Sequence, residues 1–376
     1  MGYSSVRGGM DAIEHAESLI AAQVTDSAHP VALPQVRDHV ELLLDQVMGE
    51  GGVYDVDLGA LAVKQAEGDP IEAGFLLRAY RTTLPRVGYS FPSSGRQMRI
   101  LRRVSSAFRD IPGGQVLGRT RDYTQRLLDF ALRDTPPQAT ASAADLDALP
   151  AGAAPEEFPL VIDTLRADGL MHEAPRRTSD EEPFDVTREP LRFPATRAAR
   201  LQVLARGETG AMLSLAYAGM RGYGGAHGYI AELRYGDLPV LISHPITGGQ
   251  VRIGWVPVTE CYQVVGGDEG AKHEHDGSED HVHEHDHSPD YVVSYGVVIG
   301  RNERKAISMS ILDGSLKKAT KSGAAIEDEE YVMYHIDSIE AMGFVEHLKL
   351  PHYVDFVASV QRTSKVRELV AAARRG

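Results

Sequence analysis

The N-terminal part of the chain is dominated by apolar residues that recur at helical spacing. This periodicity predicts helices over residues 11–23, 35–48, 57–67 and 71–83. Pro34 is expected to open the second helix and the glycines at 49, 51 and 52 to close it. Residues 96–109 mix five arginines with apolar residues, and we predict a basic amphipathic helix there. Helical spacing returns over 196–220.

Strand-like segments appear only in the second half of the chain. Residues 228–235, 238–243, 251–257 and 291–299 carry β-branched and aromatic side chains between Gly, Pro and Asp turns. Helices followed by strands indicate an α+β fold: a helical N-terminal part, an antiparallel or mixed β region and a mixed C-terminal segment.

The composition divides the chain into three parts. Residues 1–133 are expected to form the mainly helical part, and 134–195 a linker-rich connection with Ala, Pro, Thr and Asp. Residues 196–376 form the α+β part. They contain a histidine-rich insertion at 268–290, which is expected to be disordered because it has almost nothing apolar to bury.

Charge and cysteine content limit the classes of function. With 53 acidic and 39 basic residues the formal charge is −14, which disfavours nucleic-acid binding but permits a local basic pocket for a small anion. Apolar runs fall short of the roughly 20 residues that cross a membrane, and no secretion signal is apparent. The single cysteine, Cys261, excludes an internal disulfide and a cysteine-rich zinc site. We therefore expect a cytoplasmic protein without nucleic-acid or membrane partners.

Two groups of histidines are candidate metal ligands. Residues 272–288 hold six histidines among acidic residues, and this segment is either a solvated insertion between two strands or a metal-buffering loop. His347 and His352 flank Pro351, which ends a helix and forces a turn that can bring both rings to one point. They are either ordinary histidines at a helix end or half of an open zinc site, completed by water, substrate or a partner chain.

Glycine-rich turns offer candidate anion sites. Gly113-Gly114 follows the arginine-rich segment, and a second turn spans 221–228. Backbone N–H groups in such turns can hold phosphate, although tight turns of this kind often serve structure alone. Neither turn matches a Walker or dinucleotide motif, and the chain contains no GxSxG, HExxH or kinase signature.

Four stretches together resemble a known family. They are VRGG with Ala12-Ile13, RVSSAFRDIPGGQVLGRTRDYTQRLLDF at 103–130, RGET at 206–209 leading into RGY at 221–223, and GFVEHLKLPHYVDF at 343–356. The chain resembles, over nearly its whole length, the I subunit of the bacterial carbon–phosphorus lyase core complex. The histidine-rich insertion departs from that pattern, so no family role is transferred to it.

The resemblance implies partners, a reaction and a metal. The expected partners are the G, H and J subunits and the ABC-type K and L proteins, the J subunit carrying the iron–sulfur radical chemistry. The expected substrates are ATP and an alkylphosphonate, joined as a ribose 1-phosphonate 5-triphosphate with release of adenine; alone, the subunit is expected to be a purine nucleoside triphosphate nucleosidase. The resemblance also implies Zn2+ at His347 and His352.

This reaction needs cationic and backbone donors for the phosphates. The candidate substrate-binding residues are Arg96, Arg99, Arg103, Gly113, Gly114 and Gln115. Glu346 is expected to support the histidine pair, and the catalytic acid and base are not identified. The alternative function is a non-catalytic scaffold or metal-binding subunit.

Overall fold

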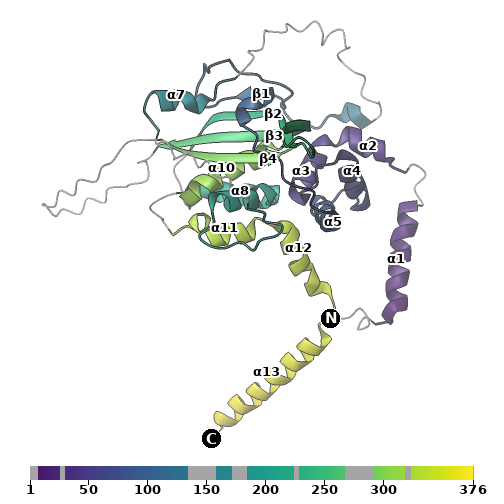
Figure 1. The fold of residues 1–376 in the computed structure, drawn as a ribbon. Helices are drawn as coiled ribbons and strands as arrows, with labels where there is room; N and C mark the ends of the chain where they lie inside the picture. The colour runs from purple at the N-terminus through teal and green to yellow at the C-terminus, as the bar shows by residue number, and fades with distance from the viewer. Residues whose placement is uncertain are drawn as a thin grey trace, which may run out of the picture.

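The computed structural model describes residues 7–25, 30–133, 158–171, 184–223, 228–266, 291–317 and 323–375. It confirms the α+β class: helices surround a four-stranded antiparallel sheet of order β1-β2-β3-β4 (Figure 1). The predictions for residues 134–157 and for the 268–290 insertion lie outside the described residues, whereas 184–194 form no helix or strand. No helix in the described ranges is long and apolar enough to cross a membrane.

The N-terminal helices form where periodicity predicts them. They are α1 (Gly9–Thr25), α2 (Leu33–His39), α3 (Glu41–Gly51), α4 (Val56–Gln65) and α5 (Pro70–Thr82). Asp55 and Asp69 cap α4 and α5 by accepting from first-turn N–H groups. The predicted helix 35–48 is in fact two helices. The backbone leaves helical geometry at Val40 (φ −120°, ψ 38°), so that α2 can pack against α4.

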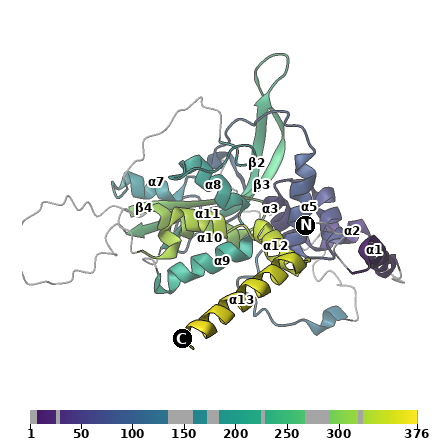
Figure 2. The same ribbon diagram turned by 90° about the horizontal axis from the view of Figure 1, so that it is seen from below.

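The sheet is built from β1 (Arg99–Val104), β2 (Tyr229–Ser243), β3 (Gln250–Gly266) and β4 (Tyr291–Ile299). β2 and β3 continue beyond their neighbours as a two-stranded arm, which Figure 2 shows projecting from the body. The predicted strands 228–235 and 238–243 form one continuous strand, β2. Pro239 is accommodated within it because it lies past the last β1 pairing, Arg99 with Asp237.

The predicted helix over 96–109 is wrong. A 3-10 turn (Gly95–Gln97) leads into strand β1, which pairs with β2 at the edge of the sheet. Met98 and Ile100 contribute to a small apolar cluster with Leu238 and Val258. The spacing of the apolar residues in this segment is compatible with both a helix and a strand. Pairing with a strand distant in sequence decided its conformation.

The predicted helix over 196–220 is also interrupted. α8 (Arg197–Arg206) ends before Gly207, and α9 (Thr209–Ala218) begins after Glu208, followed by a π-helical turn (Gly219–Tyr223). The Glu208 carboxylate accepts from the N–H groups of Gly210 at 2.6 Å and Ala211 at 2.7 Å. This cap starts a new helix in the middle of an apolar pattern that looks continuous.

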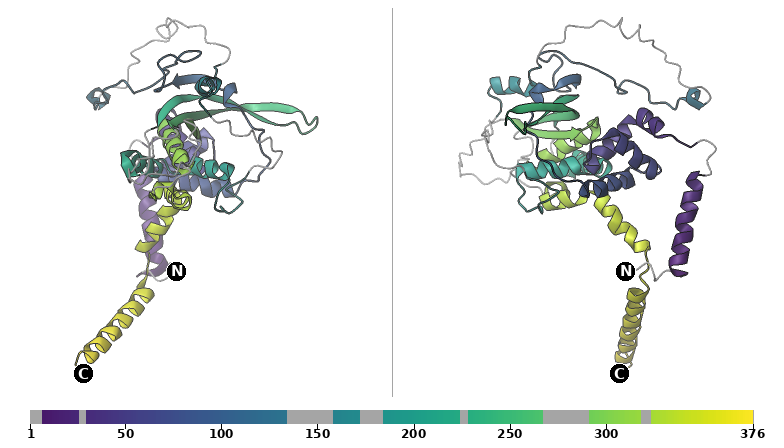
Figure 3. Two further views of the ribbon diagram at one scale, coloured as in Figure 1. Left: turned by 90° about the vertical axis from the view of Figure 1, so that its left-hand side faces the viewer. Right: turned by 45° about the vertical axis from the view of Figure 1, so that its right-hand side comes forward.

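The remaining helices cover both faces of the sheet and extend beyond it. They are α7 (Val161–Ala167), α10 (Glu303–Lys317), α11 (Glu329–His335), α12 (Ser338–Glu346) and α13 (Tyr353–Ala373), with short 3-10 turns at Phe130–Arg133, Ala325–Glu327 and His347–Lys349. Cys261 packs in the core beside α10, and Val264, three residues on, packs in the core beside α7. α13 projects away from the body, as the two views of Figure 3 show.

Candidate functional site

The turn between α12 and α13 brings His347 and His352 together. The 3-10 turn His347–Lys349 and Pro351 reverse the chain, and the two imidazole centroids lie 5.3 Å apart at an interplanar angle of 54°. Both histidines are partly exposed and lie just before the start of α13. The local turn signal is therefore sufficient to pair the rings.

Backbone carbonyls orient both rings. Nδ1 of His347 contacts the carbonyl oxygen of Phe344, and Nδ1 of His352 contacts that of Leu350 at 2.6 Å. A carbonyl oxygen only accepts, so each Nδ1 carries the hydrogen and each Nε2 keeps its lone pair. Glu346, expected to support this pair, is instead ion-paired with Lys349 at 2.9 Å. The two carbonyls take the supporting position that Glu346 was expected to hold.

This donor pair fits a zinc ion. Two imidazoles on one tetrahedral zinc, with bonds of about 2.0–2.1 Å, have ring centroids roughly 5 Å apart. The observed separation of 5.3 Å agrees with that value. The described part of the chain holds no group of three or more His, Cys, Asp or Glu suited to a metal. Beside the pair, the described residues thus offer no further ligand, and completion of the shell by water, substrate or another chain stays a prediction.

The Arg103 side chain stabilises the 113–114 turn from within the protein. This side chain is fully buried and donates to Glu232 at 2.6 Å and to the carbonyls of Pro112, Gly114 and Pro159. The turn therefore presents carbonyl oxygens to a protein guanidinium. These oxygens would repel a phosphate.

The other predicted phosphate ligands also bond to protein groups. Arg96 pairs with Asp163 at 2.6 Å, and the Arg99 guanidinium lies 3.5 Å from the centroid of the Trp255 ring. Gln115 accepts from the N–H of Ser105 and donates to the carbonyl of Arg109. Arg103 and Gly114 are thus in direct contact, but none of the six candidates lines the cavity described next. Their role in substrate binding stays a prediction.

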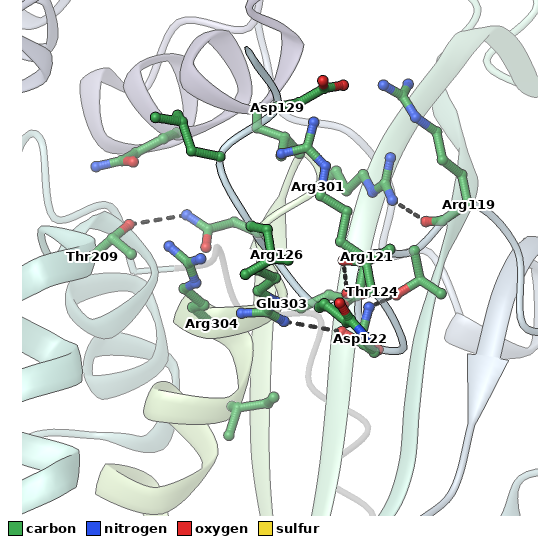
Figure 4. A pocket seen from close by; sticks show the side chains of 18 of the residues that line it. Arg119, Arg121, Asp122, Thr124, Arg126, Asp129, Thr209, Arg301, Glu303 and Arg304 are labelled. Atoms are coloured by element: carbon green, nitrogen blue, oxygen red, sulfur yellow. Dashed lines mark hydrogen bonds and ion pairs between the residues drawn. The ribbon is translucent and has the colours of Figure 1, made fainter. Parts of the chain in front are cut away.

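A cavity of about 1150 Å³ opens elsewhere on the molecule, between the loop 119–129, α3 and the first turns of α9 and α10 (Figure 4). Sequence reasoning did not identify the side chains that line it. Five arginines line it: Arg119, Arg121, Arg126, Arg301 and Arg304. Three of them cluster in the RTRDYTQR stretch, which is a detectable local signal. Their convergence with the other two across about 180 residues of sequence is not detectable locally.

A buried polar network holds one wall of this cavity. Glu50 accepts from the N–H and the hydroxyl of Thr209 at 2.9 and 2.6 Å, and Asn302 donates to the same hydroxyl at 2.9 Å. Burial raises the pKa of Glu50, while burial lowers the pKa of the Lys305 amine to about 8. The network fixes the start of α9 against the start of α10, and so fixes the shape of the wall.

Comparison with known proteins identifies the family. The model of the bacterial phosphonate metabolism protein (PhnI) family matches residues 2–370. A putative C-P lyase subunit protein, HtxH, of Stutzerimonas stutzeri is 41% identical over 379 residues, covering 99% of this chain and 98% of that protein. The alpha-D-ribose 1-methylphosphonate 5-triphosphate synthase subunits PhnI of Rhizobium meliloti and Escherichia coli are 41% and 40% identical. They cover 100% and 97% of this chain, and 97% and 98% of their own lengths. The chain therefore belongs to the bacterial phosphonate metabolism protein (PhnI) family.

Proposed function

We propose that this chain is a subunit of a cytoplasmic ribose 1-phosphonate 5-triphosphate synthase, in which an alkylphosphonate displaces adenine from ATP. Relatives that carry the synthase-subunit name match nearly the whole chain. The observation that supports the proposal within the molecule is the histidine pair, whose ring centroids lie 5.3 Å apart and whose Nδ1 atoms both contact backbone carbonyls.

The reaction exchanges one bond at the anomeric carbon. A phosphonate oxygen forms the bond to C1′ as the N9–C1′ bond breaks, and adenine leaves with the electron pair and takes up a proton. Water in place of the phosphonate gives the nucleosidase reaction. A zinc ion held by His347 and His352 would supply Lewis-acid polarisation of a bound oxygen. The carbonyls of Phe344 and Leu350 keep both imidazoles in the tautomer that this binding requires.

Partner subunits are part of the proposal, namely the G, H and J subunits and the ABC-type K and L proteins. Large apolar side chains stay exposed beside the histidine pair: Phe344 is 74% exposed, Val354 83% and Phe356 70%. Apolar surface of this kind marks an interaction site. A partner docked there would also be close enough to complete the metal shell.

The test is adenine release from ATP, measured by chromatography with and without methylphosphonate and the partner subunits. The His347→Ala/His352→Ala variant should lose bound zinc, measured by mass spectrometry of the metal, and lose adenine release. His335→Ala is the matched control because its Nδ1 also contacts a carbonyl, that of Tyr331, but no second imidazole lies beside it in the described structure. We expect it to retain zinc and activity.

The outcomes separate the two candidate functions. Absence of adenine release by the wild type with all partners present would favour the non-catalytic scaffold. If the His347→Ala/His352→Ala variant contains no zinc but still releases adenine, the metal is not required for this step. Zinc retained by the pair variant would place the metal elsewhere in the chain.

A further inference from the structure

We propose that the arginine-lined cavity binds the polyphosphate chain of a nucleoside triphosphate. This deepens the proposed function, on which it rests, because it names where the ATP of that reaction would be held. The cavity is distinct from the Gly113-Gly114 turn and from the histidine pair, neither of which contributes to its lining.

The cavity is positively charged in a protein of net charge −14. Five arginines line it, against three carboxylates, those of Asp122, Asp129 and Glu303. The negative charge of two of these carboxylates is already compensated by the buried Arg102 guanidinium. It donates to Asp122 and to Glu303, the latter at 2.6 Å. An anion entering the cavity would therefore meet a surplus of positive charge.

Several donors in the cavity are available to a ligand. The guanidinium groups of Arg121 and Arg304 have no hydrogen-bond or ion-pair partner in the described part of the chain, and both residues are exposed. Among the described residues, the Arg119 guanidinium pairs only with Glu41, at 2.8 Å, and the two side chains are 77% and 48% exposed. Such exposed pairs contribute little and are easily exchanged for a phosphate.

The start of α10 adds backbone donors to the same cavity. Asn302 caps the helix by accepting from the N–H of Lys305 at 3.1 Å. The N–H groups of Glu303 and Arg304 in the first turn have no acceptor among the described residues, and both residues line the cavity. The positive end of the helix dipole and these N–H donors stabilise a bound anion, as the arginines do.

The remaining wall is apolar, and this favours a nucleotide over a bare phosphate. It is formed by Leu42, Leu127, Leu128, Leu132 and Ile307. Leu127 and Leu128 are each 77% exposed in the protein alone, so a base or ribose packed against them would remove apolar surface from water. A ligand with an anionic chain and an aromatic end matches both walls.

The test is isothermal titration calorimetry of the full chain with tripolyphosphate, ATP and inorganic phosphate. Tripolyphosphate has no glycosidic bond and cannot be consumed by the proposed reaction. We expect the Arg121→Ala/Arg304→Ala variant to lose at least roughly tenfold in affinity for tripolyphosphate and for ATP, because charge-assisted bonds to guanidinium forks are lost. The matched control, Arg109→Ala/Arg252→Ala, removes the same charge from exposed arginines outside the cavity and should bind like the wild type.

Each outcome bears on the proposal. Unchanged affinity in the cavity variant would overturn it, as would an equal loss in the control variant, which would indicate only a general charge effect. Equal affinity for inorganic phosphate and tripolyphosphate would overturn the polyphosphate assignment in favour of a free-phosphate site. Tight, cavity-dependent tripolyphosphate binding without adenine release would uphold this site and refute the proposed reaction, so the two failures are distinguishable.

Discussion

At the scale of single residues, the arginines of this chain divide into structural and available groups. Arg102, Arg103 and Arg234 are buried in β1 and β2, and each is bonded to carboxylates. Burial of a guanidinium is costly unless an opposite charge compensates it, and each of these three has such a partner. A cationic residue in the sequence is thus weak evidence for ligand binding until its partners are known.

Arg103→Met should lower the free energy of unfolding by about 3–5 kcal/mol, because the buried carboxylate of Glu232 loses its main counter-charge and three carbonyls lose a donor. Urea denaturation measures the change. Arg99→Met is the control: Arg99, also on β1, is exposed and stacks on Trp255, so a loss of about 1 kcal/mol or less is expected. Equal losses would contradict the structural role of Arg103.

At the scale of elements, α13 differs from every helix around the sheet. It is 21 residues long and buries none of its side chains in the described structure. Most helical stability in proteins comes from packing of an apolar face, and α13 has no such packing among the residues that the structure describes. Its apolar residues therefore contribute little to the fold of the isolated subunit.

Ending the chain after Phe356 should change the free energy of unfolding by less than about 1 kcal/mol, since the deleted residues make no buried contact. Chemical denaturation of the truncated and full chains gives the comparison, and both keep the histidine pair. Ending the chain after Glu327 would serve as the contrasting control, because it removes the buried residues Val332, Ile336 and Ile339 and should prevent folding. A large loss from the shorter deletion would show that α13 packs on the body.

At the scale of the whole molecule, the ends of the 267–290 connection lie next to each other. Gly266 at the end of β3 is the register partner of Tyr291 at the start of β4. The two strands are antiparallel, so a two-residue turn is geometrically sufficient to join them. The sheet itself therefore requires no specific length between them.

Replacing residues 267–290 by Asn-Gly should leave the fold intact and adenine release unchanged. The free energy of unfolding should stay the same or rise by up to about 2 kcal/mol, because a shorter loop costs less entropy to close. Thermal unfolding and the adenine assay test this directly, with a 24-residue Gly/Ser replacement as the control for loop length. Loss of activity in both replacements, whatever the loop length, would instead assign the insertion a role in metal supply to the site.

Local signals account for most of what was foreseen. Helical spacing located α1, α4 and α5, and β-branched runs located β3 and β4, because both patterns depend on near neighbours in sequence. The pairing of His347 with His352 was also foreseeable, since a single proline sets the turn between them. The helix predicted at β1 failed because its pairing partner lies more than a hundred residues away.

The sequence alone determined the α+β class, the resemblance to a family, the single cysteine and the turn that brings the two histidines together. Only the tertiary structure decided which charges are buried and which remain free. Arg103 and Arg121 read alike in sequence, yet one is fully buried against Glu232 and the other lines an open cavity. Their difference arises from contacts with distant segments, in β2 and at the start of α10, and these contacts exist only once the chain has folded.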